Sequence, residues 1–163
     1  MIINEIQLTN IGAYRGTHSF NLRPDLDKNV ILIGGENGAG KTTLLNAIKL
    51  GLFGSYSYGY KTENAEYYKK VESILNHTAK KMDENSFHIQ VDFSLVDGFE
   101  KIDYKVTRYW TYTNTSLKET YSLLANGKPQ SEYEKDLFQS KLKEVMPPQL
   151  LDLCLFDGEE IAQ

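Results

Sequence analysis

One octapeptide has the residue types and the spacing of a phosphate-binding loop: Gly35-Glu36-Asn37-Gly38-Ala39-Gly40-Lys41-Thr42. It matches the pattern G-x-x-x-x-G-K-[ST] in full. Such a loop requires glycines because its amides must curl around phosphate oxygens, with backbone angles that side chains would obstruct. The amides and the positive end of the following helix dipole then hold the anion. The octapeptide therefore predicts a site for nucleotide phosphates.

Two side chains at the end of the octapeptide add a charge and a metal ligand. We expect the Lys41 ammonium to span the β- and γ-phosphates, where it also serves catalysis, and the Thr42 hydroxyl to ligate Mg²⁺. The ligand predicted is therefore ATP with Mg²⁺. The alternative is a glycine-rich turn with a surface lysine, which the flanking strand and helix patterns disfavour.

The elements expected to position this loop are a strand before it and a helix after it. The run Val30-Ile31-Leu32-Ile33 is typical of a strand covered on both faces, so residues 29–33 are predicted to form a central strand. From Lys41 to Phe53 apolar residues recur at helical spacings, and Gly54 is placed to end that helix. Residues 55–60 are interpreted as a mobile flap, followed by a polar helix over 64–75.

The rest of the chain predicts mainly antiparallel strands. Two strands are expected at 2–11 and 17–22, and alternating apolar residues around Asp97-Gly98 predict a half-exposed hairpin, extended by a third strand over 117–125. Ser131 and Glu134 form a capping box for a helix that ends near Val145. The fold expected is α/β, with a sheet that carries the loop and its helix plus an antiparallel β layer.

Composition limits the possible partners. The net charge of −4 and the pI near 5.4 argue against a strongly basic nucleic-acid-binding face. The paired lysines Lys69-Lys70 and Lys80-Lys81 could lie near a phosphate backbone, although charge runs usually mark solvated faces. Cys154 is the only cysteine and is expected to pack as a small hydrophobe. Neither an export signal nor a membrane span is indicated, so a cytoplasmic location is expected.

Three motifs carry a resemblance to a known family. Residues 3–15 show Ile-x-x-Ile-x-Leu-x-Asn-Ile-Gly-Ala-Tyr-Arg, residues 37–43 show Asn-Gly-Ala-Gly-Lys-Thr-Thr, and residues 47–54 show Ala-Ile-x-x-x-Leu-Phe-Gly. Together they resemble the head domains of the SMC, SbcC and RecF group of ATPases. The resemblance implies a P-loop NTPase fold of ABC type, with residues 1–163 forming the N-terminal half of a head and a coiled coil expected soon afterwards. Residues 155–161 look most like the ATPases of DNA phosphorothioation systems, the DndD family.

The resemblance also implies roles for single residues. Asn37 would contact the γ-phosphate, Thr43 the α-phosphate, and Arg15 would lie near the phosphates, the alternative being a solvated hairpin arginine. Asp157 would contact the metal or the attacking water, although it could instead cap a helix that opens at the next residue. His77 is interpreted as a helix-end histidine rather than a catalytic base.

A Walker B acid is not recognisable in the sequence, and residues 93–97 only partly imitate one. The resemblance therefore implies that the chain alone hydrolyses ATP negligibly and that its partners are the C-terminal half of its own head and a second head in an ATP-dependent dimer. DNA and other phosphorothioation proteins are further expected partners, with conformational work on DNA as the function. The alternatives are an SbcC-like DNA-repair ATPase and a regulatory nucleotide-binding module without hydrolysis.

Overall fold

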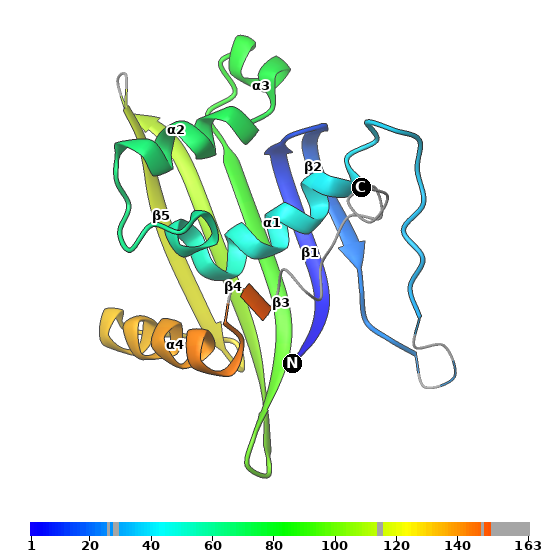
Figure 1. The fold of residues 1–163 in the computed structure, drawn as a ribbon, viewed down its shortest axis with the longest axis vertical. Coiled ribbons are helices and arrows are strands. Elements are labelled where there is room, and N and C mark those ends of the chain that lie inside the picture. The colour runs from blue at the N-terminus through cyan, green and yellow to red at the C-terminus, as the bar shows by residue number, and fades with distance from the viewer. Residues whose placement is uncertain (26, 28–29, 114–115, 148, 151–163) are drawn as a thin grey trace.

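A computed structural model describes residues 1–25, 27, 30–113, 116–147 and 149–150 (Figure 1). Six strands form one sheet in the order β2-β1-β3-β4-β5-β6, and every neighbouring pair is antiparallel. The strands are β1 (Ile2–Ile11), β2 (Tyr14–Asn21), β3 (Phe87–Asp97), β4 (Glu100–Thr113), β5 (Ser116–Ala125) and β6 (Lys128–Pro129). The helices are α1 (Lys41–Phe53), the 3₁₀ helix η1 (Gly54–Tyr58), α2 (Ala65–Ile74), α3 (His77–Lys81) and α4 (Glu132–Val145).

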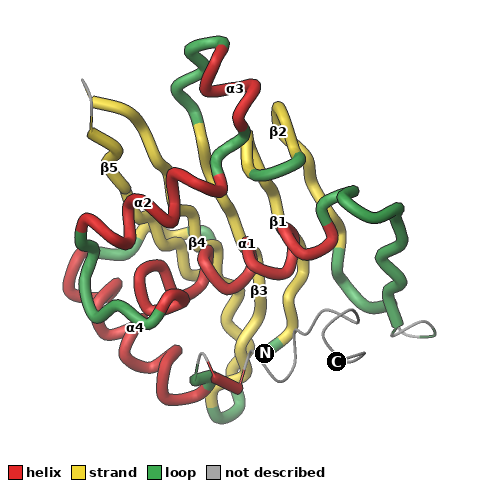
Figure 2. The backbone as a smooth tube through the Cα atoms, turned by 45° about the horizontal axis from the view of Figure 1, so that its top comes forward, coloured by secondary structure: helices red, strands yellow, loops and turns green. Residues whose placement is uncertain are grey.

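Helix α1 crosses one face of the sheet, and the core lies between them (Figures 1 and 2). Alternate β3 side chains point into this core, since successive strand residues face opposite sides. The approach is closest at Gly51, where an added methyl group would lie 2.7 Å from Val91 Cγ2. The fully buried aromatic side chains around this layer are Phe53, Tyr67, Phe87, Phe93 and Trp110.

The predicted separation into two β layers is wrong, because the strands form a single sheet. β1 pairs with β2 along one edge and with β3 along the other, for example Leu8 with His18 and with Ile89. The alternation of β1 gives it one apolar face that continues the apolar face of β3. Both edges of β1 are therefore satisfied by hydrogen bonds within the same sheet.

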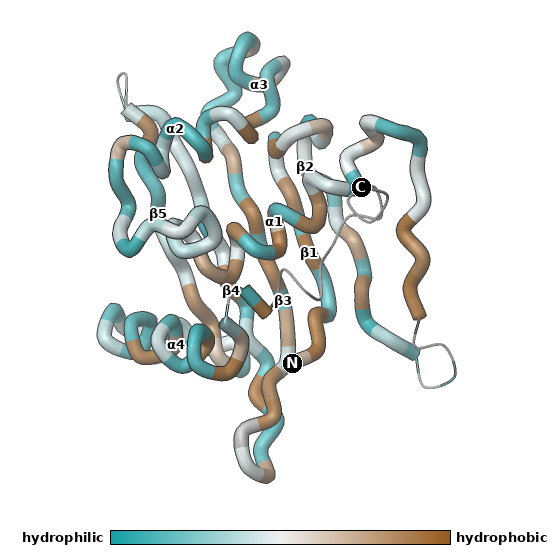
Figure 3. Tube along the Cα trace, in the orientation of Figure 1, coloured by the Kyte–Doolittle hydropathy of each residue, from teal (hydrophilic) through white to brown (hydrophobic). Residues whose placement is uncertain are grey.

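The predicted central strand before the phosphate loop is also not observed. Residues 30–33 have no strand assignment, and Val30 and Leu32 are 82% and 92% exposed. Figure 3 shows this apolar stretch outside the sheet, in the extended segment that leads to α1. Among the described residues no strand pairs with this segment, so its backbone makes no ladder hydrogen bonds there. Its side chains remain exposed, those of Ile31 and Ile33 to about half the extent of the other two.

The predicted flap over 55–60 is wrong in its first part. Residues 54–58 form η1, Gly54 and Ser55 are buried, and the Ser57 hydroxyl donates to the Gly54 carbonyl at 2.6 Å. Gly54 also ends α1 with φ of 53°, a left-handed value that favours glycine. The glycine predicted to end the helix therefore also turns the chain into η1.

Most other local predictions are confirmed. The α1 bounds are as expected, α2 begins after an Asn64 cap, and α4 begins with the capping box of Ser131 and Glu134. The three-stranded meander β3-β4-β5 is also present. Cys154 and the predicted segment 151–161 lie outside the described residues. No helix in the described ranges is long and apolar enough to cross a membrane.

Candidate nucleotide-phosphate site

The predicted phosphate loop forms the wall of a small concavity. Its volume is about 210 Å³, and it is lined by Asn37, Gly38, Gly40, Lys41, Thr42 and Thr43. Gly38 and Gly40 have φ values of 84° and 100°, which L side chains rarely adopt. The Ala39 amide donates to the Glu36 carbonyl at 3.0 Å, which closes the turn. Gly38 and Gly40 are thus at positions where the backbone angles require glycine.

The N-terminal end of α1 borders this concavity. Gly40 is the N-cap, no side chain caps the helix end, and the first turn holds no acidic residue. The first-turn amides and the positive end of the helix dipole therefore lie beside the concavity without a nearby carboxylate from that turn. This arrangement favours an anion such as a phosphate group.

The Lys41 ammonium lies against the loop itself. Its Nζ donates to the Gly35 carbonyl at 2.8 Å and to the Glu36 carbonyl at 3.1 Å. Both acceptors belong to the loop, and Lys41 is itself one of the residues that line the concavity. Its role at the β- and γ-phosphates stays a prediction.

The turn between β1 and β2 contacts the other side of the loop through Tyr14 and Gly12, two residues for which no such role was predicted. The Tyr14 hydroxyl donates to the Gly40 carbonyl at 3.1 Å. A methyl group added to Gly12 would lie 2.5 Å from Thr43 Cγ2, so the turn touches the first turn of α1. The sequence feature that could have indicated these contacts is the presence of Gly12 and Tyr14 within the Asn-Ile-Gly-Ala-Tyr-Arg motif.

Arg15 forms an ion pair with a side chain outside the loop. Its Nη2 and Nε atoms donate to Glu84 Oε1 at 2.7 and 3.1 Å, and its side chain is 49% exposed. Neither contact involves the loop. Its role at the phosphates therefore stays a prediction, and so does that of Asp157, which lies outside the described residues.

The donor set for Mg²⁺ within the described residues is small. No group of three or more His, Cys, Asp or Glu side chains in this part of the chain could hold a metal ion. Thr42 lines the concavity, and a hydroxyl oxygen suits a hard cation that keeps several waters and binds phosphate oxygens. The residues present therefore fit Mg²⁺ that arrives with the nucleotide.

A larger cavity of about 580 Å³ lies on the sheet face opposite α1, and its chemistry is different. It is lined by three acidic side chains, Glu5, Asp92 and Asp103, and by two basic ones, Arg23 and Lys105. Lys105 is already paired with Asp92 at 3.2 Å. Carboxylates repel phosphate groups, so this cavity suits a triphosphate less well than the smaller glycine-lined concavity.

Comparison with protein families places residues 5–163 in a family described as an AAA domain. The match covers nearly the whole chain and supports an SMC-like ATPase head. It does not distinguish the DndD family from its relatives. No curated protein matches the chain.

Proposed function

Because the chain belongs to the AAA domain family, a family of nucleotide-binding ATPase domains, we propose that residues 35–43 bind the triphosphate of ATP with Mg²⁺. The observation that carries this proposal is the concavity formed by the octapeptide at the uncapped N-terminus of α1, with Lys41 among its lining residues.

Each residue of the site has a distinct task in this proposal. The amides of the loop and of the first turn of α1 bind phosphate oxygens, Lys41 neutralises charge on the β- and γ-phosphates, and Thr42 supplies an oxygen ligand for the metal. Mg²⁺, when bound, neutralises the phosphate charge. Asn37 and Thr43 line the same concavity. In this proposal Asn37 contacts the γ-phosphate and Thr43 the α-phosphate.

We further propose that another segment completes this head. The exposed run at residues 30–33 supports this idea, because four consecutive apolar residues directly before the loop suit a strand with neighbours on both sides. The C-terminal half of an SMC-like head is the proposed neighbour, with a second head and DNA as further partners. Within this group the closing motif favours a DndD-like role in DNA phosphorothioation, and an SbcC-like repair role is the alternative.

A second candidate is a regulatory module that binds a nucleotide without hydrolysing it. It is supported by the lining of the concavity, since none of the described residues that line it is Asp or Glu. Hydrolysis needs an acid that completes the Mg²⁺ site and a group that orients water. The two candidates share the phosphate site and differ in whether such groups join it.

Calorimetry and thermal unfolding with ATP·Mg²⁺ test the binding proposal. Ligand at about 100 times its Kd should stabilise the folded chain by about 2.7 kcal/mol and raise the thermal midpoint. Lys41→Ala should remove most of this stabilisation, whereas Lys61→Ala, at an exposed position outside the concavity, should retain it. An equal response of both variants would refute the assigned role of Lys41.

Steady-state hydrolysis separates the two candidates. The 163-residue chain should turn over ATP negligibly, and a protein that also contains a C-terminal half with an acidic Walker B residue should turn it over. In that complete protein, Asp157→Asn should lower turnover by at least about tenfold with little change in thermal stability. Normal turnover by the Asp157→Asn protein would leave Asp157 with a capping role only.

A further inference from the structure

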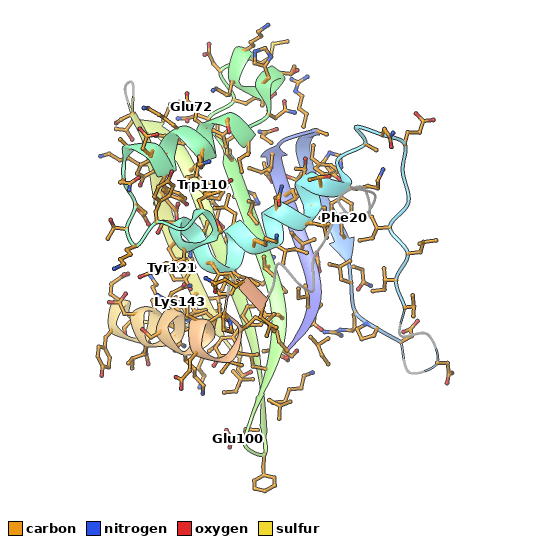
Figure 4. All side chains as sticks on the ribbon, in the orientation of Figure 1. Phe20, Glu72, Glu100, Trp110, Tyr121 and Lys143 are labelled. Atoms are coloured by element: carbon orange, nitrogen blue, oxygen red, sulfur yellow. The ribbon has the colours of Figure 1, made fainter. Side chains whose placement is uncertain are left out.

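The β1–β2 turn reaches the phosphate loop through the side chain of Tyr14. The Tyr14 hydroxyl donates to the Gly40 carbonyl, and a methyl group added to Gly40 would lie 2.9 Å from the Tyr14 ring. The ring is held in turn by Phe20, at 5.3 Å between centroids, and by His18, at 5.4 Å. Phe20 lies on β2, the strand that Tyr14 begins (Figure 4). Tyr14 thus lies between the sheet edge and the loop.

The bond to the Gly40 carbonyl bears on phosphate binding through the geometry of one peptide group. The Gly40 carbonyl and the Lys41 N–H belong to the same planar trans unit, so they point in opposite directions. The carbonyl also accepts the first α1 hydrogen bond, from the Leu44 amide at 3.0 Å. A second donor, from Tyr14, fixes the carbonyl orientation more firmly. The same bond therefore fixes the direction in which the Lys41 amide faces the concavity.

The far side of the turn is held by the junction of α2 and α3. The Asn76 side chain donates to the Gly12 carbonyl at 2.8 Å, and the Gly12 amide donates to the Ile74 carbonyl at 2.7 Å. The Asn76 amide also donates to the Asn10 carbonyl at 2.8 Å. Asn76 is only 8% exposed, so these bonds are shielded from water. The junction sets the position of Gly12, which packs against Thr43 in the loop's helix.

We propose that Tyr14 is a positioning residue for phosphate binding, and that the α2–α3 junction sets its place through the bond from Asn76 to the turn. This inference rests on the proposed function and adds two residues to it, neither of which needs to touch the nucleotide. A displacement of the α2–α3 junction would then change phosphate affinity from outside the site.

The first test is calorimetric titration of the wild-type chain and of Tyr14→Phe with ATP·Mg²⁺ and, separately, with tripolyphosphate·Mg²⁺. Tyr14→Phe keeps the ring and removes only the hydroxyl. We expect both ligands to bind about three- to tenfold more weakly, because a hydrogen bond of ordinary strength is lost from the loop. Equal loss for the two ligands identifies a role at the phosphate loop. Loss for ATP alone would mean that Tyr14 contacts the nucleoside, and affinities within twofold of wild type would mean that it positions nothing; either result overturns the inference.

The second test uses a matched pair of asparagines. Asn76→Asp keeps the acceptor that caps α3 at the Ala79 amide, at 2.9 Å, and removes the donor to Gly12. Asn64→Asp makes the same chemical change at the cap of α2, where the side chain accepts from the Tyr67 amide. We expect Asn76→Asp to weaken tripolyphosphate·Mg²⁺ binding by at least threefold and Asn64→Asp to leave it unchanged. Equal affinities for the two variants would overturn the role of the junction.

The Lys41 amide resonance of the ligand-free chain distinguishes failure of the positioning role of Tyr14 from failure of the proposed ATP binding. Tyr14→Phe should move this ¹H–¹⁵N resonance even without nucleotide, since it frees the peptide group that carries the amide. If Tyr14→Phe moves the resonance but the wild-type chain binds neither ligand, the proposed function is refuted and the positioning of the loop by Tyr14 is supported. An unmoved resonance would overturn the inference whatever the wild-type affinity is.

Discussion

Removing one partner of the buried pair of Arg108 and Glu119 should destabilise this fold strongly. The two side chains are 6% and 1% exposed, and Arg108 Nη1 donates to Glu119 Oε1 at 2.5 Å. Glu119 also accepts hydrogen bonds from Trp110 Nε1, at 2.8 Å, and from the Tyr67 hydroxyl (Figure 4 labels Trp110). Arg108 Nε donates to the Gly51 carbonyl at 3.0 Å, which links the pair to the helix behind the phosphate loop.

Glu119→Gln is the perturbation that isolates the charge, because it keeps the shape and one acceptor oxygen. It leaves the buried Arg108 guanidinium without a counterion, and breaking a buried ion pair from one side costs about 3–5 kcal/mol. The isosteric change should fall at the lower end, near ~3 kcal/mol, out of a total stability of about 5–15 kcal/mol. With an m value of about 2 kcal/mol/M, the urea midpoint should fall by about 1.5 M.

Equilibrium urea unfolding, followed by circular dichroism, measures this effect. Glu66→Gln is the matched control, because Glu66 pairs with Lys69 at 2.8 Å on the surface and should contribute less than about 0.5 kcal/mol. Adding Arg108→Met to Glu119→Gln should cost at least about 1.5 kcal/mol less than the sum of the single changes. A Glu119→Gln cost below about 1 kcal/mol, or simple additivity, would refute the reasoning.

Three further predictions concern the sheet, its outer face and α4. Gly51→Ala should lower the free energy of unfolding by about 1–3 kcal/mol, because its methyl group would overlap Val91. Gly34→Ala is the control, because an added methyl group there would have nothing within 4 Å and should change this free energy by less than about 0.5 kcal/mol. Urea unfolding compares the two variants. Burial lowers the pKa of His88 below its ordinary 6.5, so the unfolded chain binds a proton more readily. The free energy of unfolding should therefore fall as pH drops from 7 to 5, and this fall should be smaller in His88→Gln. Identical pH profiles of the wild-type chain and His88→Gln would contradict the role of His88. Ser131→Ala should cost about 1 kcal/mol by removing the α4 cap, and an unchanged thermal midpoint would count against the capping box.

Local patterns in the sequence predicted most elements, because their causes are local. The 3.6-residue period of α1, the alternation in β3 and the capping box at Ser131 each depend on residues within a few positions of one another. The strand predicted at 29–33 is not observed over the described residues 30–33, for a different reason. A strand forms only where a neighbouring strand can pair with it. The apolar run indicates that both faces of such a strand would be buried, but it does not identify the neighbouring strand.

The candidate site likewise contains residues whose positions depend on a local motif and residues whose positions depend on tertiary packing. The octapeptide defines its own backbone shape, so Gly38, Gly40 and Lys41 were predictable from sequence. Tyr14 reaches Gly40 across 26 positions, and Arg15 reaches Glu84 across 69. No local pattern identifies the partner in either pairing, because both depend on how the β1–β2 turn packs in three dimensions.

Binding of the ATP triphosphate in the glycine-lined concavity at the start of α1 can be tested at the level of single amides. The experiment is a titration of the ¹⁵N-labelled chain with ATP·Mg²⁺, followed by ¹H–¹⁵N correlation spectra. We expect the largest shifts at Gly38, Gly40 and Lys41, and small shifts at Asp92 and Lys105 in the larger cavity on the opposite sheet face. Shifts centred on Asp92 and Lys105, or a loop whose amides do not respond at saturating ATP, would contradict the claim.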